Sequence, residues 1–139
     1  MQKMTKLYAI YGASGCGRSL MPVARQQLAR DRDSSEIVFI DDALTEITQV
    51  NGHRAMSYQA FLSELACKKY VQIAIANSKI REQIATRLEK DNIALWSIAA
   101  DNVIFMDAVH IAEGSALSPF VSITSNVKIG KCFHANLYS

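Results

Sequence analysis

Cysteine is scarce in this sequence, and Cys16, Cys67 and Cys132 form no C-x-x-C pair. Three widely spaced cysteines argue against a disulfide framework and fit reduced thiols, so we expect a cytoplasmic protein. The three histidines show no metal-ligand spacing with one another or with cysteine. We therefore expect no metal site.

Strong net charge and long apolar runs are also missing. The formal net charge is +2 and the basic residues are dispersed, which argues against a nucleic-acid partner. No apolar run reaches the ~18 residues of a membrane span. The first residues lead directly into a strand pattern, so we expect no signal peptide. With 50% hydrophobic and 20% charged residues, the composition is typical of a globular protein.

The first hundred residues alternate short apolar runs with helical patterns. Buried strands are predicted at 7–11, 37–40, 71–75 and 93–98. Helical spacing of apolar residues follows the first and third runs, and another helical pattern covers 58–65. Asn51-Gly52 predicts a two-residue turn. Strands that alternate with helices predict an α/β domain over residues 1–100, with a parallel sheet and right-handed crossovers.

Residues 101–139 keep a six-residue period. One series of residues expected to point inward falls six apart: Ile111, Leu117, Ile123, Ile129 and Ala135. A second series has the same period, and each member lies four residues after a position of the first: Val109, Ser115, Val121, Val127 and Phe133. Small or turn-forming residues come directly after the first series. This hexapeptide signature predicts the first coils of a left-handed parallel β-helix, a triangular prism of short strands.

A glycine-rich loop joins the first predicted strand to the first helix. It contains Gly12, Gly15 and Gly17. Glycines at this place let backbone N–H groups approach a phosphate, and the helix N-terminus adds a favourable dipole. A tight turn without a ligand would also explain the glycines.

Polar residues follow the second and third predicted strands. Asp41 and Asp42 end the second strand, where an acid in dinucleotide folds holds a ribose hydroxyl. Asn77 lies just past the third strand, at the same sheet edge as the glycine loop. A turn would also account for the aspartates, and a helix N-cap for Asn77.

Taken together, these segments resemble a bacterial family of sugar O- and N-acyltransferases. The family includes sialic acid O-acetyltransferase and UDP-amino-sugar N-acetyltransferases. The loop 11–17 is similar to its Y/I-G-A-S-G-H-G, 37–42 to its I-x-F-L-D-D, and 73–77 to its A-I-G-N, followed by x-x-I-R. Hexapeptide coils then begin where that family has them.

The resemblance implies a Rossmann-like domain that binds a UDP-linked amino- or deoxy-sugar. The residues it assigns to the substrate are Gly12, Ser14, Gly15, Cys16, Gly17, Asp41, Asp42 and Asn77. The glycine loop would line the pyrophosphate, and the two aspartates would face the uridine. The β-helix of such enzymes forms a trimer and holds acetyl-CoA between neighbouring prisms. The implied function is the UDP-sugar-binding part of an acetyl-CoA-dependent sugar N- or O-acetyltransferase of bacterial surface-glycan synthesis.

Three departures from the family qualify this expectation. Cys16 stands where the family has a loop histidine, and Ala76 replaces the glycine before its asparagine. The catalytic histidine is expected a few residues after Ser139, so we predict that these 139 residues are inactive. His134 points away from the prism interior in the hexad and does not match the catalytic position. A non-catalytic nucleotide-binding module and an NAD-type oxidoreductase domain remain alternatives.

Overall fold

The computed structural model describes residues 5–136 of the chain. Its N-terminal part is a six-stranded sheet of order β3-β4-β2-β1-β5-β6. The strands are β1 (Lys6–Tyr11), β2 (Glu36–Ile40), β3 (Thr48–Val50), β4 (His53–Met56), β5 (Lys68–Ile73) and β6 (Ala94–Leu95). Every neighbouring pair is parallel except β3 with β4. The parallel α/β sheet expected from the alternating pattern is confirmed.

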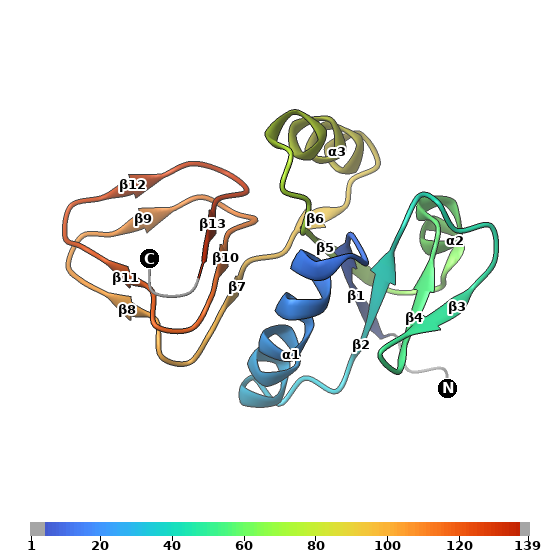
Figure 1. The fold of residues 1–139 in the computed structure, drawn as a ribbon, viewed down its shortest axis with the longest axis horizontal. Helices are drawn as coiled ribbons and strands as arrows, with labels where there is room; N and C mark the ends of the chain where they lie inside the picture. The colour runs from blue at the N-terminus through green and yellow to red at the C-terminus, as the bar shows by residue number, and fades with distance from the viewer. Residues whose placement is uncertain (1–4, 137–139) are drawn as a thin grey trace.

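Helices cover both faces of this sheet, as Figure 1 shows. They are α1 (Gly15–Arg30), α2 (Tyr58–Ser63) and α3 (Ser78–Lys90). Because side chains alternate along a strand, Tyr8 and Ile10 of β1 join the α1 core, whereas Leu7 and Ala9 join the core under α2 and α3. The buried residues of both cores are mainly aliphatic and aromatic, which fixes the sheet between two layers.

The turn at Asn51-Gly52 links β3 and β4 into an antiparallel hairpin. Both residues have positive φ, +50° for Asn51 and +81° for Gly52. Asparagine and glycine tolerate that region better than other residues, which is why this pair predicts the hairpin correctly. β4 then pairs in parallel with β2 and extends the sheet on that side.

The C-terminal part is the start of a parallel β-helix. Its short strands are β7 (Ile98–Ala99), β8 (Ile104–Phe105), β9 (His110–Ile111), β10 (Ala116–Leu117), β11 (Ser122–Ile123), β12 (Lys128–Ile129) and β13 (His134–Ala135). They form three faces, β13-β10-β7, β11-β8 and β12-β9, visible at the left of Figure 1. Paired residues such as Ile98 and Ala116 are three hexads apart, one full coil.

The prism interior is filled by the residues that the six-residue period identifies. Leu117, Val121, Ile123 and Ala135 are buried in one cluster, with Val109, Ile111, Val127 and Ile129 packed against it. Phe133 lies outside this cluster and is 38% exposed. The predicted hexapeptide coils are therefore confirmed, although 137–139 lie outside the described residues.

The predicted strand at 93–98 is wrong in its extent. The structure breaks it after Leu95, so that β6 pairs with β5 whereas β7 pairs with β10 of the prism. The first coil thus includes Ile98 and Ala99, and the division at 100/101 stays a prediction. Among residues 5–136, no helix is long and apolar enough to cross a membrane.

Candidate functional site

The glycine loop lies where the order of the sheet changes direction. β1 sits between β2 and β5, so the chain leaves β1 toward one side and returns on the other. At the carboxyl end of β1, Gly12 N donates to Ile40 O, and Ala74 N donates to Tyr11 O. Ligands of open α/β sheets bind at such a switch point. The loop, Asp41 and Asn77 therefore share one edge of the sheet.

Two of the loop glycines are required by packing and one is not. A Cβ on Gly12, whose φ is +124°, would lie 2.6 Å from Ala74 O. A Cβ on Gly17 would lie 1.8 Å from Gly12 O. By contrast, a Cβ on Gly15 would meet nothing within 4 Å. The open space at Gly15, at the N-terminus of α1, leaves the backbone accessible to a ligand.

Ser14 and Cys16 flank this open position. Ser14 precedes α1 with extended backbone, and its hydroxyl makes no cap hydrogen bond to the helix. Cys16 is a free, exposed thiol in the first turn. The N–H groups of that first turn have no partner within the helix, and together with the Ser14 hydroxyl they form a set of donors suited to an anion.

The two aspartates after β2 have different surroundings. Asp41 is half-buried, and its Oδ1 accepts the N–H of Ala43 at 3.0 Å. Asp42 is turned toward α3, where it accepts the Tyr11 hydroxyl at 2.7 Å and lies 3.6 Å from Arg87. Arg87 also donates to the Tyr11 hydroxyl at 2.7 Å. Asp42 is thus already engaged, whereas one oxygen of Asp41 has no hydrogen bond in the described structure.

Asn77 acts as the N-cap of α3. Its Oδ1 accepts the N–H of Ile80 at 3.1 Å, which leaves the amide NH₂ group for a ligand. Arg81, one turn further, donates to the carbonyls of Ile75 and Ala76. These contacts hold the loop that follows β5, and Ala74 at its start lies against Gly12 of the glycine loop.

Two cavities lie between the α/β domain and the coils. The first, here called the glycine-loop cavity, measures about 510 Å³ and is lined by Gly15, Cys16 and Ser19 on one side and His134 and Asn136 on the other. The second, here called the β5-end cavity, is also about 510 Å³ and extends from Cys16, His134 and Asn136 to Ala76 and Arg81. Of the residues that the sequence assigns to the substrate, only Gly15 and Cys16 line these two cavities.

A buried glutamine connects β5 to the coils beside these cavities. Gln72 is fully buried, and its Nε2 lies 2.7 Å from Trp96 O and 2.9 Å from Ser115 O. Its Oε1 lies 3.0 Å from Nε2 of His134. Burial, followed by the nearby charge of Arg81, lowers the pKa of His134. The ring is therefore held against the sheet and favours its neutral form.

Comparison with known proteins agrees with this arrangement. Residues 8–88, more than half of the chain, match the family described as the PglD N-terminal domain. The chain belongs to this family. The resemblance to sugar acyltransferases is confirmed, and the matched range contains the glycine loop, both aspartates and Asn77.

Individual relatives extend the similarity into the coils. A GDP-perosamine N-acetyltransferase of Escherichia coli O157:H7 is 38% identical over 96% of this chain and 60% of its own length. WeeI from Acinetobacter baumannii AYE is 44% identical, with a TM-score of 0.89 over 96% of this chain and 62% of its own. The acetyltransferase domain of PglB from Neisseria gonorrhoeae FA1090, solved with acetyl coenzyme A, has the same fold at 22% identity and a TM-score of 0.79, over 98% of this chain and 63% of its own. The chain thus spans about three fifths of the length of these relatives.

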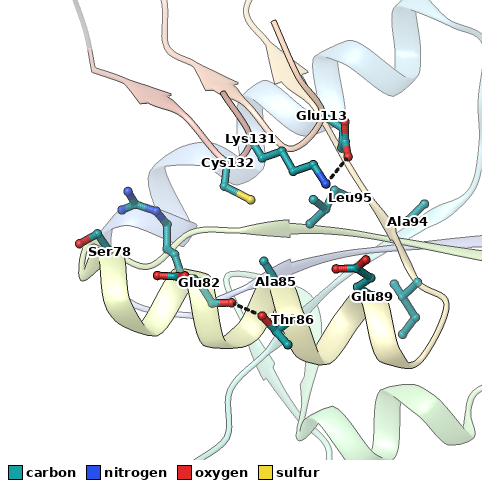
Figure 2. A pocket seen from close by; sticks show the side chains of 12 residues that line it. Ser78, Glu82, Ala85, Thr86, Glu89, Ala94, Leu95, Glu113, Lys131 and Cys132 are labelled. Carbon is teal, nitrogen blue, oxygen red and sulfur yellow. Dashed lines mark hydrogen bonds and ion pairs between the residues drawn. The ribbon is translucent and has the colours of Figure 1, made fainter. Parts of the chain in front are cut away.

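A third cavity, of about 620 Å³, lies away from the predicted residues (Figure 2). It opens between α3 and two turns of the coils, with Glu82, Glu89 and Ala85 on the helix side. Lys131 and Glu113 form an ion pair across its coil side at 3.3 Å. None of the residues assigned to the nucleotide sugar lines this cavity. Within the described chain, no three His, Cys, Asp or Glu side chains gather as a metal site.

Sequence reasoning missed the residues that join the two parts of this family member. Gln72 interrupts an apolar strand pattern, and a polar residue at a buried position needs hydrogen-bond partners. That interruption was the available signal. His134 was correctly placed on the outside of the prism, but its partner Gln72 is far away in sequence and could not be found from spacing.

Proposed function

We propose that the α/β domain binds a nucleoside-diphosphate-linked amino sugar, the acyl acceptor of a sugar N-acetyltransferase. The observation that carries this proposal is the glycine loop at the switch point of the sheet. Gly12 and Gly17 are fixed by packing, whereas Gly15 faces open space beside a cavity that reaches the coils. A diphosphate at the N-terminus of α1 would direct the attached sugar into that cavity.

Different predicted residues would bind different parts of the ligand. The backbone at Gly15 and the hydroxyl of Ser14 would hold the diphosphate, with the partial positive charge of the helix N-terminus. Asp41 offers an acceptor toward the nucleoside, since one of its oxygens is not bonded to Ala43. Asp42 would act indirectly, by holding Tyr11 and Arg87. The amide of Asn77 lies at the same edge.

Two nucleobases are candidates. The resemblance to UDP-amino-sugar N-acetyltransferases favours uridine, and this is our first expectation. A guanosine nucleotide is the second candidate, because the relative that is 38% identical is named a GDP-perosamine N-acetyltransferase. Both bases present an N–H group that a carboxylate such as Asp41 can accept.

The coils would supply the acetyl-donor side of the reaction. We assign 101–139, together with the coil strand Ile98–Ala99 that precedes the expected boundary at 100/101, to the start of an acyltransferase β-helix. The neisserial relative was solved with acetyl coenzyme A, which supports acetyl-CoA as the donor of the whole protein. Ile104, Phe105 and Met106 are 49–56% exposed on the first coil and fit burial against neighbouring copies in a trimer.

Calorimetric titration of the protein with UDP, GDP and NAD tests the proposal. We expect one of the two diphosphates to bind more tightly than NAD, and Asp41→Ala to weaken that binding by about 0.5–1.5 kcal/mol. Gln26→Val, an exposed substitution on α1, is the control and should leave binding unchanged. Tighter binding of NAD would instead support the oxidoreductase alternative, and no binding of either diphosphate would refute the proposal.

A further inference from the structure

One column of outward-facing residues runs up the prism face that meets the α/β domain. Ile98, Ala116 and His134 occupy equivalent positions in β7, β10 and β13 and pair with one another. Ile98 and Ala116 are buried against α1, in the same core as Leu20 and Val23. His134 is the only polar residue of these three, and it lines the same cavity as Gly15 and Cys16 of the glycine loop.

The hydrogen bonds of Gln72 determine which nitrogen of His134 carries its proton. The Nε2 of Gln72 lies among the carbonyl oxygens of Trp96, Gly114 and Ser115, which only an amide NH₂ group can satisfy. Its Oε1 is therefore the atom facing His134 Nε2, and this imidazole nitrogen must be the donor. In a neutral imidazole, Nδ1 is then an acceptor.

The surroundings of His134 favour the neutral ring, in which one nitrogen is an acceptor. Burial, followed by the charge of Arg81, lowers the pKa of the ring, whereas a weaker hydrogen bond to the Ile73 backbone raises it, and the net direction favours the neutral form. His134 lines both the glycine-loop cavity and the β5-end cavity. Across the first cavity stands Cys16, whose thiol is a weak hydrogen-bonding group. The imidazole is therefore the stronger hydrogen-bonding group of this pair.

We propose that His134 is a specificity-determining residue, whose Nδ1 accepts a hydrogen bond from a hydroxyl or amino group of the sugar, and that Gln72 is the positioning residue that fixes its tautomer. This inference rests on the proposed function, because the sugar reaches His134 only when the diphosphate lies at Gly15. On this inference, the coil side of the cavity selects the sugar, whereas the α/β domain binds the nucleotide.

The test compares a nucleotide with the corresponding nucleotide sugar. UDP is titrated beside UDP-N-acetylglucosamine, and GDP beside GDP-mannose, into the wild-type protein, His134→Ala and His134→Asn. The control is His110→Ala, which removes an exposed histidine from the equivalent hexad position on another face of the prism. Circular dichroism and thermal unfolding establish that each variant is folded.

We expect the wild-type protein to bind the nucleotide sugar more tightly than the nucleotide. His134→Ala should reduce that advantage by about two- to tenfold, the value of one neutral hydrogen bond, without changing the affinity for the nucleotide. His134→Asn, which can still donate to Gln72 and offers an oxygen acceptor, should restore part of the advantage. His110→Ala should bind both ligands as the wild type does.

Three results would overturn the inference. If His134→Ala weakens nucleotide and nucleotide sugar equally, the residue has only a structural role. If it weakens neither, the sugar does not reach the ring. If the wild-type protein binds neither nucleotide, the proposed function fails and this inference fails with it. The first two results, by contrast, refute only the role of His134 and leave nucleotide binding intact.

Discussion

The three glycines of the loop provide a test in which neighbouring substitutions should have opposite effects. In Gly17→Ala, the new Cβ would lie 1.8 Å from the Gly12 carbonyl oxygen, a backbone atom that cannot rotate away. In Gly12→Ala, the Cβ would lie 2.6 Å from Ala74 O, at a φ of +124°. Overpacking costs about 1–3 kcal/mol, and a disfavoured backbone region costs about 1–3 kcal/mol more.

The third substitution, Gly15→Val, should leave stability intact and reduce binding. A Cβ at Gly15 has nothing within 4 Å, so we expect the free energy of unfolding to change by less than about 0.5 kcal/mol. The valine would cover the backbone that a phosphate must approach. A hydrogen bond to a charged group contributes about 1.5–3 kcal/mol, so its loss should weaken diphosphate binding roughly ten- to hundredfold.

Thermal unfolding and calorimetry on the same samples separate these effects. A loss of about 2 kcal/mol should lower the unfolding midpoint of Gly12→Ala and Gly17→Ala by roughly 6–10 °C. Gly15→Val and the exposed control Gln26→Val should unfold like the wild type, and only Gly15→Val should lose affinity. A destabilised Gly15→Val would show that the space at Gly15 is not open. A stable Gly15→Val with wild-type affinity would show that the loop does not contact the phosphates.

Three further predictions concern the aspartates, pH and activity. Asp42→Ala should lower the unfolding midpoint more than Asp41→Ala, because Asp42 binds Tyr11 and Arg87, whereas Asp41→Ala should lose more nucleotide affinity. Folding lowers the pKa of His134, so the unfolded state binds more protons and the free energy of unfolding should fall as pH drops below about 6.5. His134→Asn should reduce that slope in urea titrations at pH 7.5 and 5.5. In a thiol-release assay with acetyl-CoA and UDP-amino-sugars, the 139 residues alone should show no turnover.

Each of these has a result that would contradict it. Equal stability losses in the two aspartate variants would mean that the contacts of Asp42 contribute nothing. An unchanged pH slope in His134→Asn, matching the control His110→Asn, would assign the slope to other groups. Turnover by the 139 residues would identify His134 as a candidate base, since it lines both cavities. A version carrying further coils is the positive control for the acetyl-CoA assay.

Most of the fold could be predicted from local patterns. The apolar runs ending at Tyr11 and Ile40 identified buried parallel strands, because such strands are covered on both faces. The six-residue period identified the coils, since each hexad contributes one inward aliphatic residue to a shared core. These features depend on neighbours in the sequence, which is why spacing alone finds them.

The break after Leu95 and the role of Asp42 could not be predicted in this way. The run 93–98 is apolar apart from Ser97, but Ala94 and Leu95 pair with β5 whereas Ile98 pairs with β10. The partner that decides this lies in another part of the chain. Asp42 likewise depends on Arg87 of α3, which reaches it only after the crossover is formed. The sequence therefore indicates which polar residues lie at the sheet edge. Their hydrogen-bond partners depend on contacts between distant parts of the chain.

Two glutamine side chains hold the α/β domain and the coils together by hydrogen bonds to backbone atoms. Gln27 of α1 donates to Ser97 O at 2.9 Å and accepts the N–H of Ala99 at 2.8 Å. Gln72 of β5 donates to carbonyls of both the first coil and the segment before it. Because these bonds are made to backbone atoms, they hold the coils in addition to the packing of Ile98 and Ala116 against α1. Substitutions in the cavity wall, such as at His134, can therefore alter the ligand that fits while the coils remain in place.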